Sequence, residues 1–150
     1  MNLIDARTWS GNWAWGLPLI VLTVVMHVCG LGLMYEGVLR VLRGAVERRG
    51  SMSKFALVMS VTALLATLLH GIEAGFWGAA YRFLGALPDN NSAMLYSLSA
   101  MTAYGHANLY LQAHWQLMDA LEAVNGLLLF RLTTAFLFAM IKGVWPLRRR

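Results

Sequence analysis

Three long, mostly apolar segments limit what this chain can fold into. They occupy residues 17–42, 55–85 and 117–143. A helix needs roughly 20 mostly apolar residues to cross the hydrocarbon core of a bilayer. The composition agrees, because 59% of the residues are hydrophobic and 13% are charged, whereas soluble domains carry about 25% charged residues. We therefore predict an all-α integral membrane protein with three transmembrane helices.

The first two spans carry signals for their boundaries. Pro18 is predicted to stand at the start of the first helix, where a missing N–H group is tolerated. The second segment exceeds the length that a perpendicular span needs, so it is predicted to be long, tilted, or broken near its glycines at 71, 75 and 78. A single cysteine, Cys29, excludes a disulfide within one chain and a cysteine-based metal site.

Basic residues are unevenly distributed along the chain. Nine of the 12 lysines and arginines lie either from the end of the first span to the start of the second, or from the end of the third span onward. They are Arg40, Arg43, Arg48, Arg49, Lys54, Lys142, Arg148, Arg149 and Arg150. Cytoplasmic loops are enriched in Lys and Arg. This distribution predicts the N-terminus outside and the C-terminus in the cytoplasm, and the chain between the second and third spans must then enter and leave on the outer side.

That connecting stretch includes "SLSAMTAYGHANLYLQAHW", residues 97–115, which has no formal charge. It holds too many polar groups for contact with lipid, yet its apolar residues recur at helical spacing. Asp89 and the three polar residues after it offer helix N-caps, and Gly105 offers a stop. Irregular backbone at membrane depth is tolerated only where protein or water surrounds it. The pattern predicts a re-entrant pore loop.

The run from 86 to 140 resembles the pore-loop and inner-helix region of bacterial two-transmembrane potassium channels. "TAYGHAN" stands where that family has roughly T-T-L-G-Y-G-D, and "LEAVNG" matches its L-E-A-x-x-G. The resemblance implies a homotetramer in the bacterial inner membrane with K⁺ as the permeating ion. Its pore domain would cover 55–150, with an outer helix 55–85, a pore loop 90–112, a pore helix 92–103, an inner helix 117–143 and a basic cytoplasmic tail. Residues 1–54 would add an N-terminal segment, one further span and a basic loop.

The filter implied by this resemblance departs from the family pattern. Ala103 lacks the threonine hydroxyl of the inner filter mouth, Ala107 replaces a glycine, and His106 replaces the tyrosine. His106 would form either a pH-sensitive ring or a structural one. The carbonyl ends of four pore helices would still favour a cation. The expected filter residues are Thr102, Ala103, Tyr104, Gly105, His106, Ala107 and Asn108.

The inner helix has two notable positions. Gly126 stands where the family has its hinge. Arg131 is flanked by apolar residues, and an arginine near the bilayer centre costs at least about 2.5–3.5 kcal/mol. It would either pair with Glu36 of the first span or line an inner cavity. In the second case it would share a face with Leu127, Thr134 and Phe138.

Three more polar side chains are candidate supporting residues. His70 and Glu73 are one helical turn apart, so they are expected to form a hydrogen-bonded pair or, with His27 or His106, to ligate a metal. The pair is the preferred interpretation, and no metal or cofactor is expected. Glu122 faces the pore helix or a neighbour's inner helix, and the resemblance favours a packing role behind the filter.

These observations leave three functional hypotheses. The favoured one is a cation channel with a non-standard filter that conducts monovalent ions with undetermined selectivity. The second is a non-conducting channel-fold protein that acts as a subunit or sensor. The third is a small haem-binding protein that uses His27 and His70. An enzyme is not expected, because no nucleophile has a nearby base. The basic clusters are expected to meet lipid headgroups and not nucleic acid.

Overall fold

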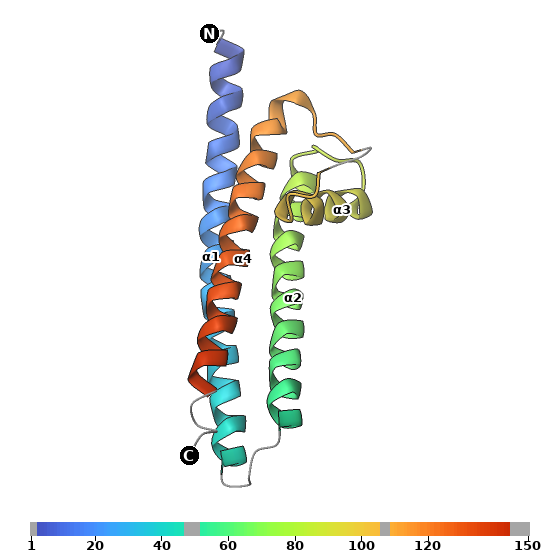
Figure 1. The fold of residues 1–150 in the computed structure, drawn as a ribbon. Helices are drawn as coiled ribbons and strands as arrows, with labels where there is room; N and C mark the ends of the chain where they lie inside the picture. Colours follow the sequence, from blue (N-terminus) through green and yellow to red (C-terminus); the bar gives the residue numbers. More distant parts are fainter. Residues whose placement is uncertain (1–2, 47–51, 106–108, 145–150) are drawn as a thin grey trace.

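The chain forms a bundle of three long helices with one short helix lying across it (Figure 1). The computed structural model describes residues 3–46, 52–105 and 109–144. Among these residues there are helices and no strand. The elements are α1 (Leu3–Val46), α2 (Met52–Phe83), α3 (Asn90–Met101), the 3-10 turn η1 (Ala113–Trp115) and α4 (Gln116–Val144).

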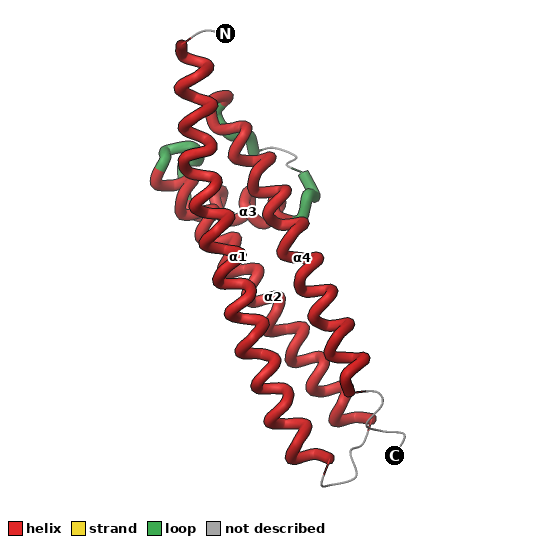
Figure 2. Tube along the Cα trace, turned by 90° about the vertical axis from the view of Figure 1, so that its left-hand side faces the viewer, coloured by secondary structure: helices red, strands yellow, loops and turns green. Residues whose placement is uncertain are grey.

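The long helices alternate in direction, and α1 contacts both α2 and α4 (Figures 1 and 2). Helix α3 contacts α2 and α4 near one end of the bundle. The chain leaves α2 and enters α4 at that same end. The segment between them therefore starts and finishes on one side of the bundle.

Three stretches are long and apolar enough to span a membrane, namely Thr8–Val41, Met52–Phe83 and Ala113–Gly143. This confirms the prediction of three helices that are long and apolar enough to cross a membrane. Large apolar side chains lie on the outside, such as Leu33 at 73% and Leu57 at 65% exposure. Such an exposed apolar surface is typical of contact with lipid and not with water.

The predicted start of the first helix was wrong. Helix α1 begins at Leu3 and continues through Pro18, which lies inside the helix. Proline leaves the carbonyl four residues earlier without its helical partner, but contacts with the rest of the bundle hold the N-terminal part in place. Asn12 accepts a hydrogen bond from the backbone N–H of Met118 at 3.1 Å and donates one to the carbonyl of His114 at 2.6 Å.

The second helix, α2, is unbroken from Met52 to Phe83. At about 1.5 Å per residue, its 32 residues exceed the roughly 30 Å of a hydrocarbon core. Of its glycines, Gly78 packs closely, because a Cβ there would lie 3.3 Å from the carbonyl oxygen of Ala93 in α3. The predicted break is therefore absent from this helix, and Gly78 instead marks a close approach of two helices.

Helix α3 is capped at both ends by its own sequence. The Asp89 carboxylate accepts hydrogen bonds from the backbone N–H of Ser92 at 2.9 Å and from its hydroxyl at 2.7 Å. At the other end Ala103 has a left-handed φ of 52°. Its N–H donates to Ala100 O at 2.9 Å, and that of Tyr104 donates to Ser99 O at 3.0 Å. These bonds form a Schellman motif.

The motif ends α3 earlier than the sequence suggested. The helix covers 90–101 and not 92–103, and the chain turns at Ala103 before it reaches Gly105. An alanine in this conformation costs roughly 1–2 kcal/mol, which a glycine would not.

We expect Ala103→Gly to raise the free energy of unfolding by about 1 kcal/mol, because relief of the left-handed strain outweighs the added entropy of the unfolded chain. Thermal unfolding of the purified protein in detergent measures this. Ala100→Gly is the control, and it should destabilise by about 1 kcal/mol because Ala100 is helical. Equal losses in the two variants would contradict a strained turn at Ala103.

Candidate functional site

The predicted filter segment follows the carboxyl end of α3. The Thr102 hydroxyl donates to Leu98 O of its own helix at 2.8 Å, which stabilises the last turn. The next three residues are exposed, and Tyr104 is 88% exposed. His106, Ala107 and Asn108 lie outside the described residues. Within one chain, the part of the filter segment that the structure describes is therefore uncovered.

The predicted inner-pore residues form an exposed stripe on α4. Leu127 is 46% and Phe138 is 58% exposed, and Arg131 and Thr134 between them are exposed too. The Thr134 hydroxyl donates to Phe130 O of the same helix at 2.8 Å. None of the residues that the structure describes buries this face. We call these four residues the α4 stripe.

Arg131 does not pair with Glu36, so that alternative was wrong. The carboxylate of Glu36 contacts Arg40, one turn away on α1, at 2.9 Å. Spacing of four residues makes this local pair easy to form. Within residues 3–46, 52–105 and 109–144, Arg131 has no ion pair.

Gly126 lies where the carboxyl end of α3 meets α4. A Cβ at this position would lie 2.1 Å from the backbone oxygen of Met101. Helix α4 continues without interruption through it. The hinge implied by the resemblance stays a prediction, whereas the close approach of two backbones at Gly126 is a direct feature of the fold.

A cluster of buried, hydrogen-bonded side chains joins α2, α3 and α4, with Glu122 of α4 at its centre. Tyr81 of α2 donates to Glu122 Oε2 at 2.7 Å, and the Ser97 hydroxyl of α3 is hydrogen-bonded to Glu122 Oε1. Ser97 also bonds to Ala74 O of α2 at 2.7 Å. Glu122 and Ser97 are fully buried. Of the two orientations left open by the sequence, Glu122 faces α3.

A second buried group lies between α1, α2 and α4. Glu73 Oε1 is 2.9 Å from His27 Nδ1, and Glu73 Oε2 is 3.2 Å from His70 Nδ1. The Thr133 hydroxyl lies 3.0 Å from His27 Nε2 and 3.1 Å from His70 Nε2. The contact between His70 and Glu73 follows the predicted one-turn spacing. We call these four residues the core cluster.

Sequence reasoning did not place Thr133 in the core cluster or fix His27 in it. One sequence signal could have grouped these residues. His27, His70 and Thr133 are polar residues that all lie well inside their apolar spans, where buried polar side chains need partners. Two more contacts between α1 and α4 were missed: Asn125 donates to the Thr23 hydroxyl at 2.8 Å, and Asn12 binds the start of α4. Both asparagines and Thr23 are buried.

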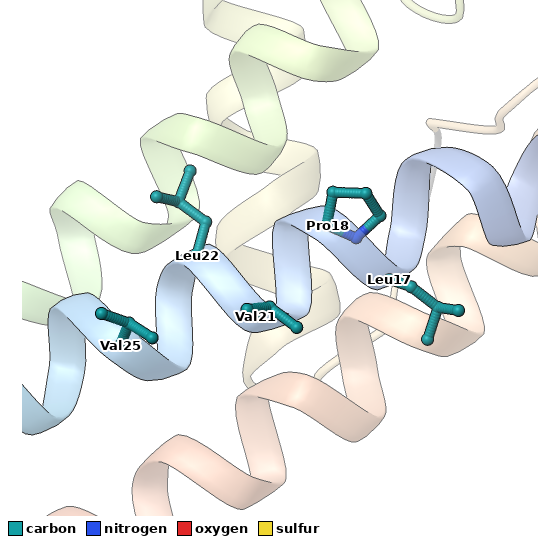
Figure 3. Close-up of a pocket in the computed structure, with 5 residues that line it drawn as sticks. All are labelled: Leu17, Pro18, Val21, Leu22 and Val25. Atoms are coloured by element: carbon teal, nitrogen blue, oxygen red, sulfur yellow. The ribbon is translucent and has the colours of Figure 1, made fainter.

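An apolar recess on α1 is not a candidate site. It is lined by Leu17, Pro18, Val21, Leu22 and Val25, which follow one another along the helix (Figure 3). These five side chains offer no polar group that would orient a ligand. The recess is best explained as part of the lipid-facing surface.

Comparisons with family models, curated proteins and solved structures found no match to this chain. The potassium-channel resemblance is therefore carried by the quoted motifs alone.

Proposed function

We propose that this chain assembles as a homotetramer that forms a cation pore of the potassium-channel-like type. In this arrangement α2 is the outer helix, α3 the re-entrant pore helix, residues 102–108 the filter, and α4 the inner helix. K⁺ is the expected permeating ion, and the membrane is the bacterial inner membrane. The basic residues after α1 and α4 would face the cytoplasm.

The observation that carries the proposal is Arg131. It lies near the middle of the apolar stretch Ala113–Gly143 and is exposed, with no ion pair among the described residues. Exposure to hydrocarbon would cost at least about 2.5–3.5 kcal/mol. A water-filled cavity between several copies of α4 removes that cost. The same assembly would cover the exposed segment after α3.

The direction of α3 supports a cation as the permeating species. Its carboxyl end, at Met101, packs against α4 and is followed by the filter segment. A helix carries about half a negative charge at this end. Four such ends around one axis would attract cations. The four copies of Arg131 would repel these cations further along the pore.

A second candidate function is a non-conducting subunit or sensor with the same fold. Arg131 favours it too, because a ring of four guanidinium groups repels cations. A measurement of ion flux distinguishes the two candidate functions.

We expect Arg131→Gln to increase K⁺ flux into proteoliposomes roughly tenfold. One guanidinium about 10 Å from a K⁺ ion in water repels it by about 0.4 kcal/mol, so four would raise the barrier to permeation by about 1.7 kcal/mol. Flux should be measured with K⁺ and Na⁺ for the unmodified protein and for Arg131→Gln. Arg40→Gln is the matched control, because Arg40 pairs with Glu36 on α1 away from the stripe, and its flux should be unchanged.

Two results would contradict the pore. Flux equal to that of empty liposomes for every variant would favour the non-conducting alternative. A monomer in lipid nanodiscs, measured by mass, would exclude both candidates because neither forms without several copies.

The haem hypothesis has no support in this geometry. The ring centroids of His27 and His70 are 5.1 Å apart, and both Nε2 atoms contact the same Thr133 hydroxyl. Both rings contact the same Glu73 carboxylate and the same Thr133 hydroxyl, so no space for a porphyrin lies between them. We do not propose haem binding.

A further inference from the structure

In the core cluster, the polar contacts outnumber the hydrogens that are available to form hydrogen bonds. Its four contacts run from Glu73 to each histidine and from each histidine to Thr133. With Glu73 ionised and both histidines neutral, the cluster carries one hydrogen on each histidine and one on Thr133. Three hydrogens cannot satisfy four contacts. In this protonation state one contact brings two lone pairs together.

The geometry identifies that contact. His70 Nδ1 and Glu73 Oε2 are 3.2 Å apart, yet neither atom makes a hydrogen bond of acceptable angle with any residue that the structure describes. Both atoms are buried. Buried polar atoms without a partner destabilise a fold, and charged ones do so more strongly. A cation at this position would remove the cost.

The two sides of the cluster differ in chemistry. Both Nδ1 atoms face the Glu73 carboxylate, whereas both Nε2 atoms face Thr133. One ligand atom from each of His27, His70 and Glu73 lies within 4.8 Å of the other two, and the two Nδ1 atoms are the ring nitrogens in contact with the carboxylate. On the other side, one hydroxyl oxygen can accept a hydrogen bond from both Nε2–H groups.

We propose that His27, His70 and Glu73 bind one divalent transition-metal ion of the zinc class through both Nδ1 atoms and the carboxylate. Thr133 holds both rings through their Nε2–H groups, which is the role that outer-shell partners have in metal sites. In this state Thr133 accepts from both Nε2–H groups, and both Nδ1 lone pairs and the Glu73 carboxylate face a cation. The site clamps α1 to α2, and Thr133 links it to α4.

The donor set selects the type of ion. Imidazole nitrogens suit zinc, copper, iron and nickel, whereas magnesium and calcium prefer oxygen ligands. Two histidines and one glutamate are a common zinc set. Two imidazoles on one tetrahedral ion, with metal–nitrogen distances of about 2.0–2.1 Å, place the ring centroids roughly 5 Å apart. The observed distance of 5.1 Å agrees with this value.

The site is independent of the proposed pore. It lies between α1, α2 and α4 of one chain, and its α4 residue, Thr133, is buried, whereas the residues of the α4 stripe are exposed. Its failure or success does not depend on whether the protein conducts ions.

The test uses the full chain with its two peripheral histidines removed, as His106→Gln/His114→Gln. This parent variant retains the whole core cluster. Zinc is supplied during growth and purification, because the site is buried, and loose metal is then removed by dialysis. We expect one zinc per chain by elemental analysis, and a higher unfolding temperature than that of parent protein prepared in chelator.

Two variants made in the parent locate the ligands. His27→Gln/His70→Gln should lose the bound zinc, and Thr133→Val should weaken zinc affinity roughly 10- to 100-fold. Replacing zinc with Co²⁺ should give the intense visible absorption of a four-coordinate site in the parent.

The proposal is overturned if the folded parent retains no zinc after dialysis and its unfolding temperature is the same with and without metal. Because this result comes from the parent alone, it stands even if the cluster variants do not fold.

Discussion

Replacing Gly126 with alanine should destabilise the protein by at least about 3 kcal/mol. The added Cβ would lie 2.1 Å from the backbone oxygen of Met101, and a backbone atom cannot rotate away. Overfilling a packed interior typically costs about 1–3 kcal/mol. The upper end of that range is the smallest loss expected here, because the two helices must separate. Thermal and denaturant unfolding in detergent, followed by circular dichroism, measures the loss.

The chain supplies matched controls for this substitution. At Gly75 in α2 and Gly143 in α4, an added Cβ would meet no atom within 4 Å. Alanine in these helices should stabilise by about 0.5–1 kcal/mol because of its higher helix propensity. If Gly126→Ala behaved like these two, the close packing of α3 on α4 would be wrong.

The second large effect is expected at Glu122, where two substitutions should have opposite outcomes. Ser97 has one hydroxyl hydrogen and two nearby acceptors, Ala74 O and Glu122 Oε1. Both contacts are satisfied if Glu122 carries a proton and donates it to Ser97, while Ser97 donates to Ala74. Tyr81 then donates to the other Glu122 oxygen. The hydrogen count thus matches a neutral carboxyl group.

A glutamine reproduces that pattern, because its amide N–H donates and its carbonyl accepts. We expect Glu122→Gln to stay within about 1 kcal/mol of the original protein. Glu122→Leu leaves Tyr81 and Ser97 without this partner in a buried place, which should cost about 3–4 kcal/mol in total. Unfolding in detergent distinguishes them. Gln116→Leu, at an exposed position of α4, should change little.

A large loss in Glu122→Gln, comparable with that in Glu122→Leu, would show that the group holds an ionised carboxylate. In that case the hydrogen-bond assignment around Ser97 would have to be reversed.

Much of the fold was accessible from the sequence because apolar length and helix caps are local properties. Three spans follow from hydropathy, and the N-cap Asp89 was among the caps that the sequence offered for α3, although the helix begins at Asn90 and not at the predicted Ser92. The end of α3 was misplaced by two residues because Gly105 is the more obvious stop than Ala103. The start of α1 was misplaced because Pro18 usually begins helices, whereas here contacts of Asn12 with α4 extend the helix past it.

The site was less accessible because it depends on the register between helices. The one-turn spacing of His70 and Glu73 predicted their contact, since both residues are on α2. Nothing local places Thr133 or His27 beside them, because the relative depth and rotation of α1 and α4 are set by packing. The same reason applies to Arg131, whose expected partner Glu36 is occupied by a closer arginine.

The contacts of α1 have a consequence for movement. Buried polar bonds tie this helix to α4 at three depths, through Asn12, Thr23 and the cluster around His27. In the proposed tetramer, a tilt of α4 that widens the pore must either move α1 through the surrounding lipid or break those bonds. The first helix would therefore oppose opening, and the thickness of the surrounding bilayer would set how strongly it does so.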